Sequence, residues 1–404
     1  MKVALLGYGT VGSGVVEVIQ SNRDSIAKRA GEPIELKYVL DLREFPGDPV
    51  NEMIVHDFNT ILEDDEVEIV AEAMGGINPA YGFAKAVLEK GKSYVTSNKE
   101  LVALHGGELL EIARKNNVNF LFEASVGGGI PIIRPLNQSI TADEIYEITG
   151  ILNGTTNFIL TKMKDDGRTF EDVLKEAQEL GYAEKNPAAD VEGYDACRKI
   201  AILASLAFGE HVSFEDIPTE GITGITKEDM IYAEKMNCVI KLLGTCQKQD
   251  DNVFARVAPM LISKNHPLAM VNNVFNAIFV KGNMVGDVMF YGKGAGKLPT
   301  ASAVVADIVD AAKHKGTNIM TIWNREKIEL KAKEDVKVGY FVRVKKEDEE
   351  VEAKVKAVFG EVEAIDGLAD EYAFITKVMK ERHFAEKIND LGEMQIISKI
   401  RVQE

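Results

Sequence analysis

Short apolar runs alternate with amphipathic segments along the first third of the chain. Segments that predict buried strands lie at residues 2–6, 35–40, 66–73, 94–96 and 119–123. Apolar residues at helical spacing follow residue 12 and recur between residues 79 and 88, which predicts intervening helices. Strands that alternate with helices are typical of a doubly wound parallel sheet. We therefore expect an α/β domain at the start of the chain.

The pattern changes after residue 131. Further strands are expected at residues 144–152, 252–262, 274–281 and 287–291, and helices at 170–180 and 301–312. The apolar segment that holds Cys238 and Cys246 has a helical pattern and is expected in the core. This mixture predicts a second domain of the α+β class. Small residues between positions 301 and 312 indicate a helix that packs back against the first domain.

The last part of the chain, from about residue 331, is more strongly charged. Its expected elements are a strand at 339–345, a helix at 351–359, strands at 362–365 and 372–379, a helix at 383–391 and a strand at 394–402. The order βαββαβ is that of a small ferredoxin-like unit. We therefore expect three domains, which are residues 1–130 with about 297–330, residues 131–296, and residues 331–404.

Composition and charge exclude several classes of partner. The chain has 404 residues and a formal net charge of −17, and nucleic acid and anionic membranes repel an acidic surface. No apolar run is long enough to span a bilayer, and the first one leads into a glycine-rich turn rather than a signal-peptide pattern. Cys197, Cys238 and Cys246 match no disulfide framework and no zinc spacing. We expect a cytoplasmic protein.

The glycine-rich turn at residues 7–12 reads GYGTVG, with Thr10 and Val11 between the last two glycines. Gly7, Gly9 and Gly12 form a G-x-G-x-x-G motif with a predicted strand before it and a predicted helix after it. Such glycines let the backbone approach a pyrophosphate, which binds at the helix N-terminus. The motif predicts dinucleotide binding. The simpler alternative is a loop that only packs the helix against the sheet.

Two charged residues follow the second predicted strand. An acid such as Asp41 at this place binds the ribose hydroxyls of NAD, whereas an arginine such as Arg43 binds the 2′-phosphate of NADP. Both residue types are present, so the choice between NAD and NADP stays open, and both could equally be solvated turn charges.

The stretch at residues 181–207 concentrates carboxylates ahead of an apolar helix. It carries Glu184, Asp190, Glu192 and Asp195, and Lys199 lies four residues after Asp195, one turn along the same helical face. An ammonium group that is partly desolvated and fixed by a carboxylate can donate a proton to a reacting oxygen. The alternative is an ordinary surface ion pair, which contributes little.

Two further segments lie at the ends of predicted strands. Lys99 follows the strand at 94–96, where a side chain points into the ligand crevice of an open α/β sheet; it could equally be a surface lysine at a helix start. After the strand at 119–123, Glu123 precedes a glycine-rich run. Exposed carbonyls beside a carboxylate can bind Na⁺ or K⁺, and the plainer alternative is a crossover between domains.

Several segments together resemble homoserine dehydrogenase, from residue 2 to about residue 312. These segments are GYGTVG at 7–12, TSNKE at 96–100, EASVGGGIPII at 123–133, ILNGTTN at 151–157, residues 181–204, HPLA at 266–269 and residues 283–307. The resemblance implies a Rossmann domain followed by a substrate and dimerisation domain, hence a homodimer or a dimer-based oligomer. It also implies interconversion of L-aspartate 4-semialdehyde and L-homoserine with NAD(P)H, in the biosynthesis of threonine, methionine and isoleucine.

Matching positions imply roles for individual residues. Lys199 resembles the proton donor with Asp195 as its partner, Glu184 the ligand of the substrate ammonium with Asp190 nearby, and Lys99 a group that contacts substrate and nicotinamide. The remaining matches are Gly181 and Gly296 in the cofactor and substrate crevice, and Glu123, Val126, Gly128 and Ile130 in a monovalent-cation loop.

The C-terminal segment resembles an ACT domain, an amino-acid-sensing unit, by the order of its elements. The turn at residues 345–350, where such domains often carry glycine and proline, is entirely charged. We therefore expect weak or no inhibition by threonine.

Two alternative functions compete with the dehydrogenase. An acylating semialdehyde dehydrogenase needs a cysteine nucleophile beside a base, but Cys197 should lie on a different helical face from Lys199. A non-catalytic nucleotide sensor has no need of a proton donor, so the joint presence of Lys99, Glu184, Asp195 and Lys199 argues against it.

Overall fold

The computed structural model describes residues 1–249, 252–346 and 348–403. By its internal contacts the chain divides into two units, each built from separate stretches of sequence. The first unit comprises Met1–Tyr146, Arg198–Glu215 and Val280–Ile328, and the second comprises Glu147–Cys197, Asp216–Phe279 and Glu329–Glu404. The division into three domains that the sequence suggested stays a prediction.

The first unit is built on a parallel sheet with the strand order β3-β2-β1-β4-β5-β6. This is the order of dinucleotide-binding Rossmann sheets, which confirms the predicted doubly wound fold. The strands are β1 (Lys2–Leu6), β2 (Glu35–Leu40), β3 (Ile54–Val55), β4 (Val67–Glu72), β5 (Ser93–Thr96) and β6 (Phe120–Leu121).

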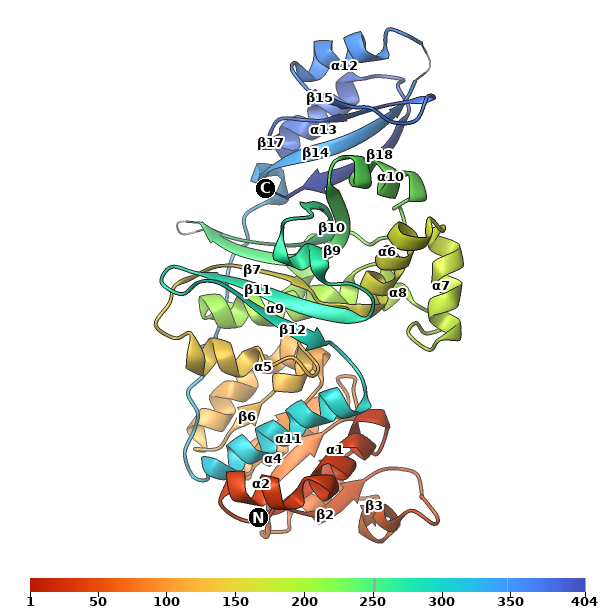
Figure 1. The fold of residues 1–404 in the computed structure, drawn as a ribbon. Helices are drawn as coiled ribbons and strands as arrows, with labels where there is room; N and C mark the ends of the chain where they lie inside the picture. The colour runs from red at the N-terminus through yellow and green to blue at the C-terminus, as the bar shows by residue number, and fades with distance from the viewer. Residues whose placement is uncertain (250–251, 347, 404) are drawn as a thin grey trace. The chain divides into compact units, whose positions relative to one another are not determined.

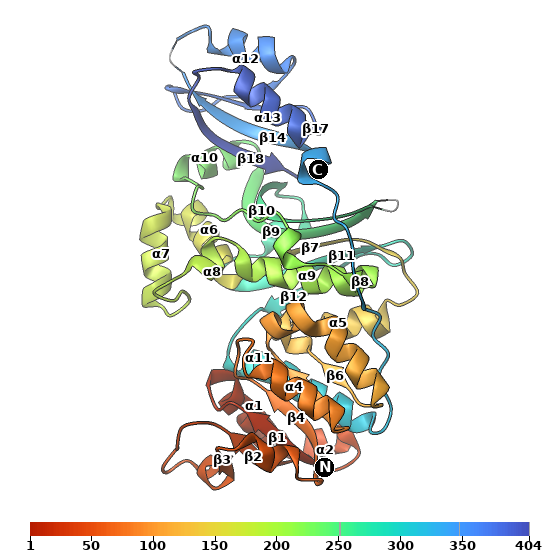
Figure 2. The same cartoon turned by 180° about the vertical axis from the view of Figure 1, so that it is seen from behind.

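Helices cover both faces of this sheet (Figures 1 and 2). One face carries α1 (Thr10–Ser21), α2 (Arg23–Ala30) and α11 (Lys297–Lys313), and the other carries α4 (Ala80–Glu89) and α5 (Lys99–Lys115). The unit also contains α3 (Phe58–Leu62), β12 (Gly286–Lys293), and the small parallel pair β8 (Glu210–His211) and β13 (Asn324–Lys327).

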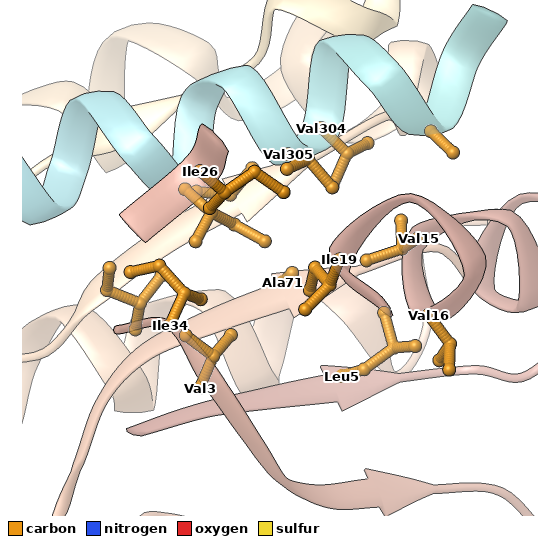
Figure 3. Packing of buried hydrophobic residues seen from close by; sticks show 14 of the residues in the cluster. Val3, Leu5, Val15, Val16, Ile19, Ile26, Ile34, Ala71, Val304 and Val305 are labelled. Atoms are coloured by element: carbon orange, nitrogen blue, oxygen red, sulfur yellow. The ribbon is translucent and has the colours of Figure 1, made fainter. Parts of the chain in front are cut away.

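Helix α11 returns to the nucleotide-binding sheet, as its small residues predicted. Val304 and Val305 pack in one buried cluster with Val15 and Ile19 of α1 and with β1 (Figure 3). Gly14 permits this approach, because a Cβ atom there would lie 2.9 Å from the Cβ of Ala301. The helix begins at Lys297, earlier than predicted, because proline is tolerated in a first helical turn.

The sheet of the second unit runs in the order β11-β7-β9-β10-β18-β14-β16-β15. Its central strands are β7 (Ile145–Ile151), β9 (Cys238–Gln249), β10 (Asn252–Ser263) and β11 (Phe275–Gly282). The associated helices are α6 (Gly154–Asp166), α7 (Phe170–Glu179), α8 (Ala188–Val191) and α10 (Lys227–Lys235), and α9 (Tyr194–Phe208) begins in this unit and ends in the first.

The segment with Cys238 and Cys246 is a strand, so the predicted helix is wrong. Strand β9 pairs with β10 from Cys238↔Ser263 to Gln249↔Asn252 in an unbroken antiparallel ladder. A short apolar run does not distinguish a buried helix from a buried strand, and here the cross-strand partner decides. The core placement is correct for Cys246, which is buried, and wrong for Cys238, which is only partly buried.

Residues 337–402 form a C-terminal module with the predicted order βαββαβ. Its sheet order β18-β14-β16-β15 is antiparallel throughout. The elements are β14 (Lys337–Lys345), α12 (Val351–Phe359), β15 (Glu363–Ile365), β16 (Glu371–Ile375), β17 (Met379–Lys380), α13 (Glu381–Asp390) and β18 (Ile396–Val402). The single strand predicted at 372–379 is thus divided into β16 and β17.

The C-terminal module joins the rest of its unit through main-chain pairing. Met260 and Leu261 of β10 pair in parallel with Arg401 and Val402 of β18. In the charged turn after β14, Glu347 lies outside the described residues, and the resemblance to an ACT domain stays a prediction.

Candidate active site

The glycine-rich turn has the geometry of a dinucleotide loop. Gly7 follows β1 directly, has a left-handed φ of 93°, and donates from its amide to the carbonyl of Leu40 at 2.8 Å. A Cβ atom on Gly12 would lie 2.0 Å from the carbonyl oxygen of Gly7, so only glycine fits there. The turn therefore depends on glycine at both positions.

Helix α1 begins inside this turn, at Thr10, and its N-terminus suits an anion. Gly9 is its N-cap and supplies no side-chain hydrogen bond to the first-turn amides. These amides and the helix dipole suit a pyrophosphate, which the small side chains allow to come close. The residues present therefore fit a dinucleotide cofactor.

Asp41 and Arg43 form one cluster with the backbone of Tyr8. The amide of Tyr8 donates to Asp41 Oδ2 at 2.9 Å, and Arg43 donates to both oxygens of the same carboxylate at 2.9 Å. The guanidinium lies over the ring of Phe45, 5.1 Å from its centroid. The hydrogen bonds from Arg43 hold the pKa of Asp41 below its ordinary value.

The ends of β4 and β5 are tied together by Glu72, which the sequence analysis did not single out. Its buried carboxylate accepts the hydroxyl of Thr96 at 2.7 Å and the amides of Met74 and Gly75 at 2.6 and 3.0 Å. The carboxyl ends of parallel strands form the ligand edge of such sheets. Glu72 thereby fixes the loop at this edge.

Lys99 is the first residue of α5, directly after the same edge. Asn98 caps this helix by accepting the amide of Leu101 at 3.1 Å. Lys99 therefore stands at a helix start that follows a strand end, and the role of its side chain in a ligand crevice stays a prediction. In the same unit, Arg198 pairs with Glu100 at 3.5 Å, which ties the α9 turn that carries Lys199 to the start of α5.

Lys199 and Asp195 occupy successive turns of α9, as their spacing predicted. Their side chains are buried, with exposures of 8% and 4%. Burial of both residues differs from the solvated surface pair that was the alternative.

In the second unit, Asn153 holds two of the predicted carboxylates. Its side-chain amide donates to Asp190 Oδ1 at 2.7 Å and to Asp195 Oδ2 at 2.9 Å. Its carbonyl oxygen accepts the amide of Thr156 at 2.9 Å and so caps α6. The residue that caps α6 therefore positions both acids. We call the group of Asn153, Asp190 and Asp195 the Asn153 clamp.

Sequence reasoning placed ILNGTTN in the family pattern but gave Asn153 no role. The available signal was an asparagine immediately before a predicted helix, which indicates an N-cap. The second function of its amide depends on residues 37 and 42 positions away. Local sequence does not contain that information.

Glu184 and Gly181 lie on an exposed loop between α7 and α8, outside the Asn153 clamp. Gly181 has a left-handed φ of 76°, and the carbonyl of Glu184 accepts from the side chain of Gln178 at 3.0 Å.

Glu123 uses its buried carboxylate to hold backbone amides. Oε1 accepts from Ile132 and Ile133 at 2.6 and 2.8 Å, and Oε2 accepts from Arg134 at 2.8 Å. Nearby, burial and the charge of Glu123 raise the pKa of Asp307 to about 8. A cation in this loop would therefore rely on backbone carbonyls, not on the Glu123 side chain.

The loop from Val126 to Ile130 packs tightly against the segment before α11. A Cβ atom on Gly128 would lie 2.3 Å from the carbonyl oxygen of Gly294. The amide of Gly129 donates to the carbonyl of Lys293 at 3.1 Å, and Gly296 is the N-cap of α11. These contacts bring two of the predicted glycine-rich loops together.

Side chains in the described ranges offer no metal centre, and two of the three thiols are not activated. No group of three or more His, Cys, Asp or Glu residues there could hold a metal ion. Burial raises the pKa of both Cys238 and Cys246, which disfavours the thiolate form. Neither suits the nucleophile of an acylating dehydrogenase.

Two family models match this chain, one over the dinucleotide-binding segment and one over the segment that follows it. The NAD-binding domain of homoserine dehydrogenase matches residues 7–123, and the homoserine dehydrogenase domain matches residues 131–309. The chain belongs to the homoserine dehydrogenase family. It is accordingly an NAD(P)-dependent oxidoreductase, and the alternative of an acylating enzyme of another family is set aside.

Individual homoserine dehydrogenases are similar in sequence over nearly the whole chain. The homoserine dehydrogenase of Bacillus subtilis is 38% identical over 99% of this chain and 97% of its own length, and that of Helicobacter pylori is 42% identical over 90% and 85%. The crystal structure of a homoserine dehydrogenase from Thiobacillus denitrificans superposes with a TM-score of 0.90 at 35% identity, covering 100% of this chain and 98% of its own. The crystal structure of the Staphylococcus aureus homoserine dehydrogenase at pH 7.0 superposes with a TM-score of 0.82 at 36% identity, covering 100% of this chain and 99% of its own.

Helices long and apolar enough to cross a bilayer are absent from the residues that the structure describes.

Proposed function

We propose that the chain interconverts L-aspartate 4-semialdehyde and L-homoserine with NAD or NADP. The observation that carries this proposal is the Asn153 clamp, in which one amide holds Asp190 and Asp195 together. A substrate that is itself an amino acid presents an ammonium group, and paired carboxylates complement it. The clamp occurs in a chain that also carries the fitted dinucleotide loop.

Lys199 is the proposed proton donor and acceptor. When bound, the nicotinamide supplies or takes up the hydride. In the reducing direction, the carbonyl oxygen of the semialdehyde gains a proton from Lys199 Nζ, which leaves homoserine as the product. In the oxidising direction the neutral amine accepts the hydroxyl proton. Asp195, one turn earlier, orients this exchange and stabilises the ammonium form of Lys199.

The remaining groups bind and align the substrate. Glu184 is proposed to bind the substrate ammonium from its exposed loop, with Asp190 beside it. Lys99, at the ligand edge of the Rossmann sheet, contacts substrate and nicotinamide. Gly181 and Gly296 are proposed to lie beside the bound substrate and cofactor, where their lack of side chains would leave room.

Asp41 and Arg43 are proposed to bind the adenosine ribose. The carboxylate suits the hydroxyls of NAD, and the exposed guanidinium, whose side chain is 60% accessible, suits the 2′-phosphate of NADP. We therefore propose dual use of the two cofactors with a modest preference.

A monovalent cation, Na⁺ or K⁺, is proposed for the loop from Glu123 to Ile130. Its ligands would be the carbonyl oxygens of Glu123, Val126, Gly128 and Ile130. This assignment is compatible with the amide-binding role of the Glu123 carboxylate, since a different part of the residue is used.

A cytoplasmic homodimer is proposed as the working form. Met284, Met289 and Tyr291 are exposed on and beside β12, an edge strand of its sheet. Exposed apolar side chains on an edge strand favour association with another chain. Light scattering after size exclusion would measure the oligomeric state.

One assay tests the function directly. NAD⁺ or NADP⁺ reduction should depend on L-homoserine and should be far slower with three analogues. L-Serine is one carbon shorter, L-threonine carries its hydroxyl on C3 instead of C4, and 4-hydroxybutyrate lacks the ammonium group. Equal rates with 4-hydroxybutyrate would contradict a site built for an amino acid.

A further inference from the structure

The turn between Asp190 and Asp195 is held from outside by residues 218–222. The amide of Ile222 donates to the carbonyl of Val191 at 2.8 Å. A Cβ atom on Gly221 would lie 2.2 Å from that same carbonyl oxygen and 2.6 Å from the Cα of Glu192. The two backbones are thus in direct contact, and movement of one requires movement of the other.

This turn sets the spacing of the clamped acids. Asp190 is the last but one residue of α8 and Asp195 is the second residue of α9, with Gly193 between them in a left-handed conformation at φ 83°. A Cβ atom on Gly193 would lie 3.1 Å from side-chain carbons of Thr219 and Val257. Residues 218–222 therefore form a wedge between the turn and β10.

The C-terminal module binds this wedge through a salt bridge. Arg401 of β18 donates to both oxygens of Glu220, at 2.7 and 2.8 Å. This arginine is 8% exposed, donates to both oxygens of Glu381 at 3.1 Å, and lies over the ring of Tyr340 at 5.4 Å from the ring centroid. Contacts within the module therefore hold the Arg401 side chain in the orientation that binds Glu220.

Glu220 and Glu381 are also bound by residues of strand β10. The amide of Glu220 donates to the carbonyl of Val257 at 2.8 Å, and Arg256, the preceding residue of β10, also pairs with Glu381. A bidentate pair between an arginine and a carboxylate fixes orientation as well as distance. This geometry distinguishes Glu220 from an ordinary surface partner, although half of its side chain (52%) stays exposed.

We propose that Arg401 is a positioning residue for Asp190 and Asp195, the two acids that complement the substrate ammonium. It acts through Glu220 and Gly221 on the turn that spaces Asp190 and Asp195. The C-terminal module thereby has a second role besides any effector binding, because it sets the affinity for the amino-acid substrate. This inference rests on the proposed function of Asp190 and Asp195.

Arg343 provides a matched control. It is another buried arginine of the module that reaches across to the rest of the unit, where it donates to Asp229 Oδ1 at 2.7 Å and to Thr226 at 3.0 Å. It also binds Glu371 within the module. Its partners lie on and before α10, not on residues 218–222.

The experiment compares Arg401→Met, Glu220→Gln and the double variant with Arg343→Met in the full-length chain. Steady-state kinetics with homoserine and with the cofactor, and the Tm, are measured for each. We expect Arg401→Met and Glu220→Gln to raise KM for homoserine by about three- to thirtyfold, the range of coupling mutations, with KM for the cofactor unchanged. The double variant should be no worse than the worse single one. Arg343→Met should lower Tm and leave KM for homoserine unchanged.

A second variant acts on the wedge directly. Gly221→Ala forces the wedge away from Val191 and should reproduce the rise in KM with Arg401 intact. If Arg401→Met and Arg343→Met had the same KM for homoserine, Arg401 would be only a structural residue. If KM for homoserine were unchanged in both Glu220→Gln and Gly221→Ala, the proposal would be wrong. Absence of homoserine oxidation in the unaltered chain would instead refute the proposed function.

Discussion

The side-chain amide of Asn153 lies 2.9 Å from Asp195 Oδ2, in the first turn of the helix that carries Lys199. The same amide binds Asp190, so a neutral donor holds two acids side by side. An arginine or lysine in that place would compete with a substrate ammonium for the carboxylates. An amide aligns them without adding positive charge, which preserves the negative potential that a cationic group requires.

Replacement of Asn153 should separate its two functions. Asn153→Ser keeps an N-cap oxygen for α6 but removes the amide donor, so Tm should stay close to that of the unaltered chain while kcat/KM for homoserine falls. Asn153→Ala loses both functions, and loss of a cap costs about 1 kcal/mol of stability. Comparing the two variants by thermal unfolding and by kinetics would check this. An unchanged kcat/KM in Asn153→Ser would show that the clamp is not needed.

Arg43 should control the choice of cofactor. Arg43→Gln removes the cation proposed for the 2′-phosphate while Asp41 keeps its hydrogen bond from the amide of Tyr8. We expect KM for NADP⁺ to rise about tenfold or more, as for loss of a charge-assisted contact of roughly 1.5–3 kcal/mol. KM for NAD⁺ should change little. Parallel kinetics with both cofactors would decide, and an equal effect on both would place Arg43 outside the ribose site.

The sequence predicted best what depends on neighbouring residues. The turn from Gly7 to Gly12 was predicted in full because its glycines, strand and helix are contiguous. The order of elements in the C-terminal module was also correct. Strand β9 was assigned to the wrong class, because its apolar pattern fits helix and strand alike and only its pairing with β10 decides.

Contacts between distant residues could not be predicted in this way. The Asn153 clamp joins three segments of the second unit, and Glu72 joins the ends of two strands. Arg343 is the largest fully buried side chain, yet its charge is typical of a surface residue in the sequence. Its burial follows from Asp229, 114 positions earlier, which no local pattern indicates.

Lys241 is a buried lysine whose partners are all neutral oxygen atoms. Its Nζ donates to Val271 O at 2.5 Å, Asn157 Oδ1 at 3.0 Å and Asn272 Oδ1 at 3.2 Å. Burial lowers its pKa to about 7; the charge of Lys164 lowers it slightly further, and the charge of Asp165 raises it slightly. These contacts pin α6, the helix that Asn153 caps, to the segment before β11.

The lowered pKa of Lys241 makes stability depend on pH. Between about pH 7 and the ordinary lysine pKa of about 10.4, the unfolded chain binds a proton there that the folded chain does not, so this group adds stability as pH rises. Lys241→Met removes this contribution and the hydrogen bonds from Nζ, although Val271 O keeps its hydrogen bond from the side-chain amide of Asn157. The stability lost in Lys241→Met should therefore be larger at pH 9 than at pH 7, by at most about 1.4 kcal/mol per pH unit.

Urea unfolding of both proteins at several pH values would measure this difference. Lys175→Met, at an exposed position on α7, is the matched control, because that side chain stays in water when the chain folds. A stability difference for Lys241→Met that does not vary between pH 7 and pH 9 would contradict a neutral buried amine.

Lys199→Met tests the proton transfer, because it keeps the length and apolar stem of the side chain and removes the donor. Positioned proton transfer contributes about 10² to 10⁴ in rate, so kcat should fall by that order while KM for the cofactor changes little. Glu184→Gln should act mainly on KM, since the substrate ammonium is held alike in the ground and transition states. Asp195→Asn should lower kcat less than Lys199→Met if Asp195 only orients the lysine. If Lys199→Met instead lowered Tm slightly and kept turnover near that of the unaltered chain, Lys199 would be a structural residue, and Lys99 would become the candidate donor.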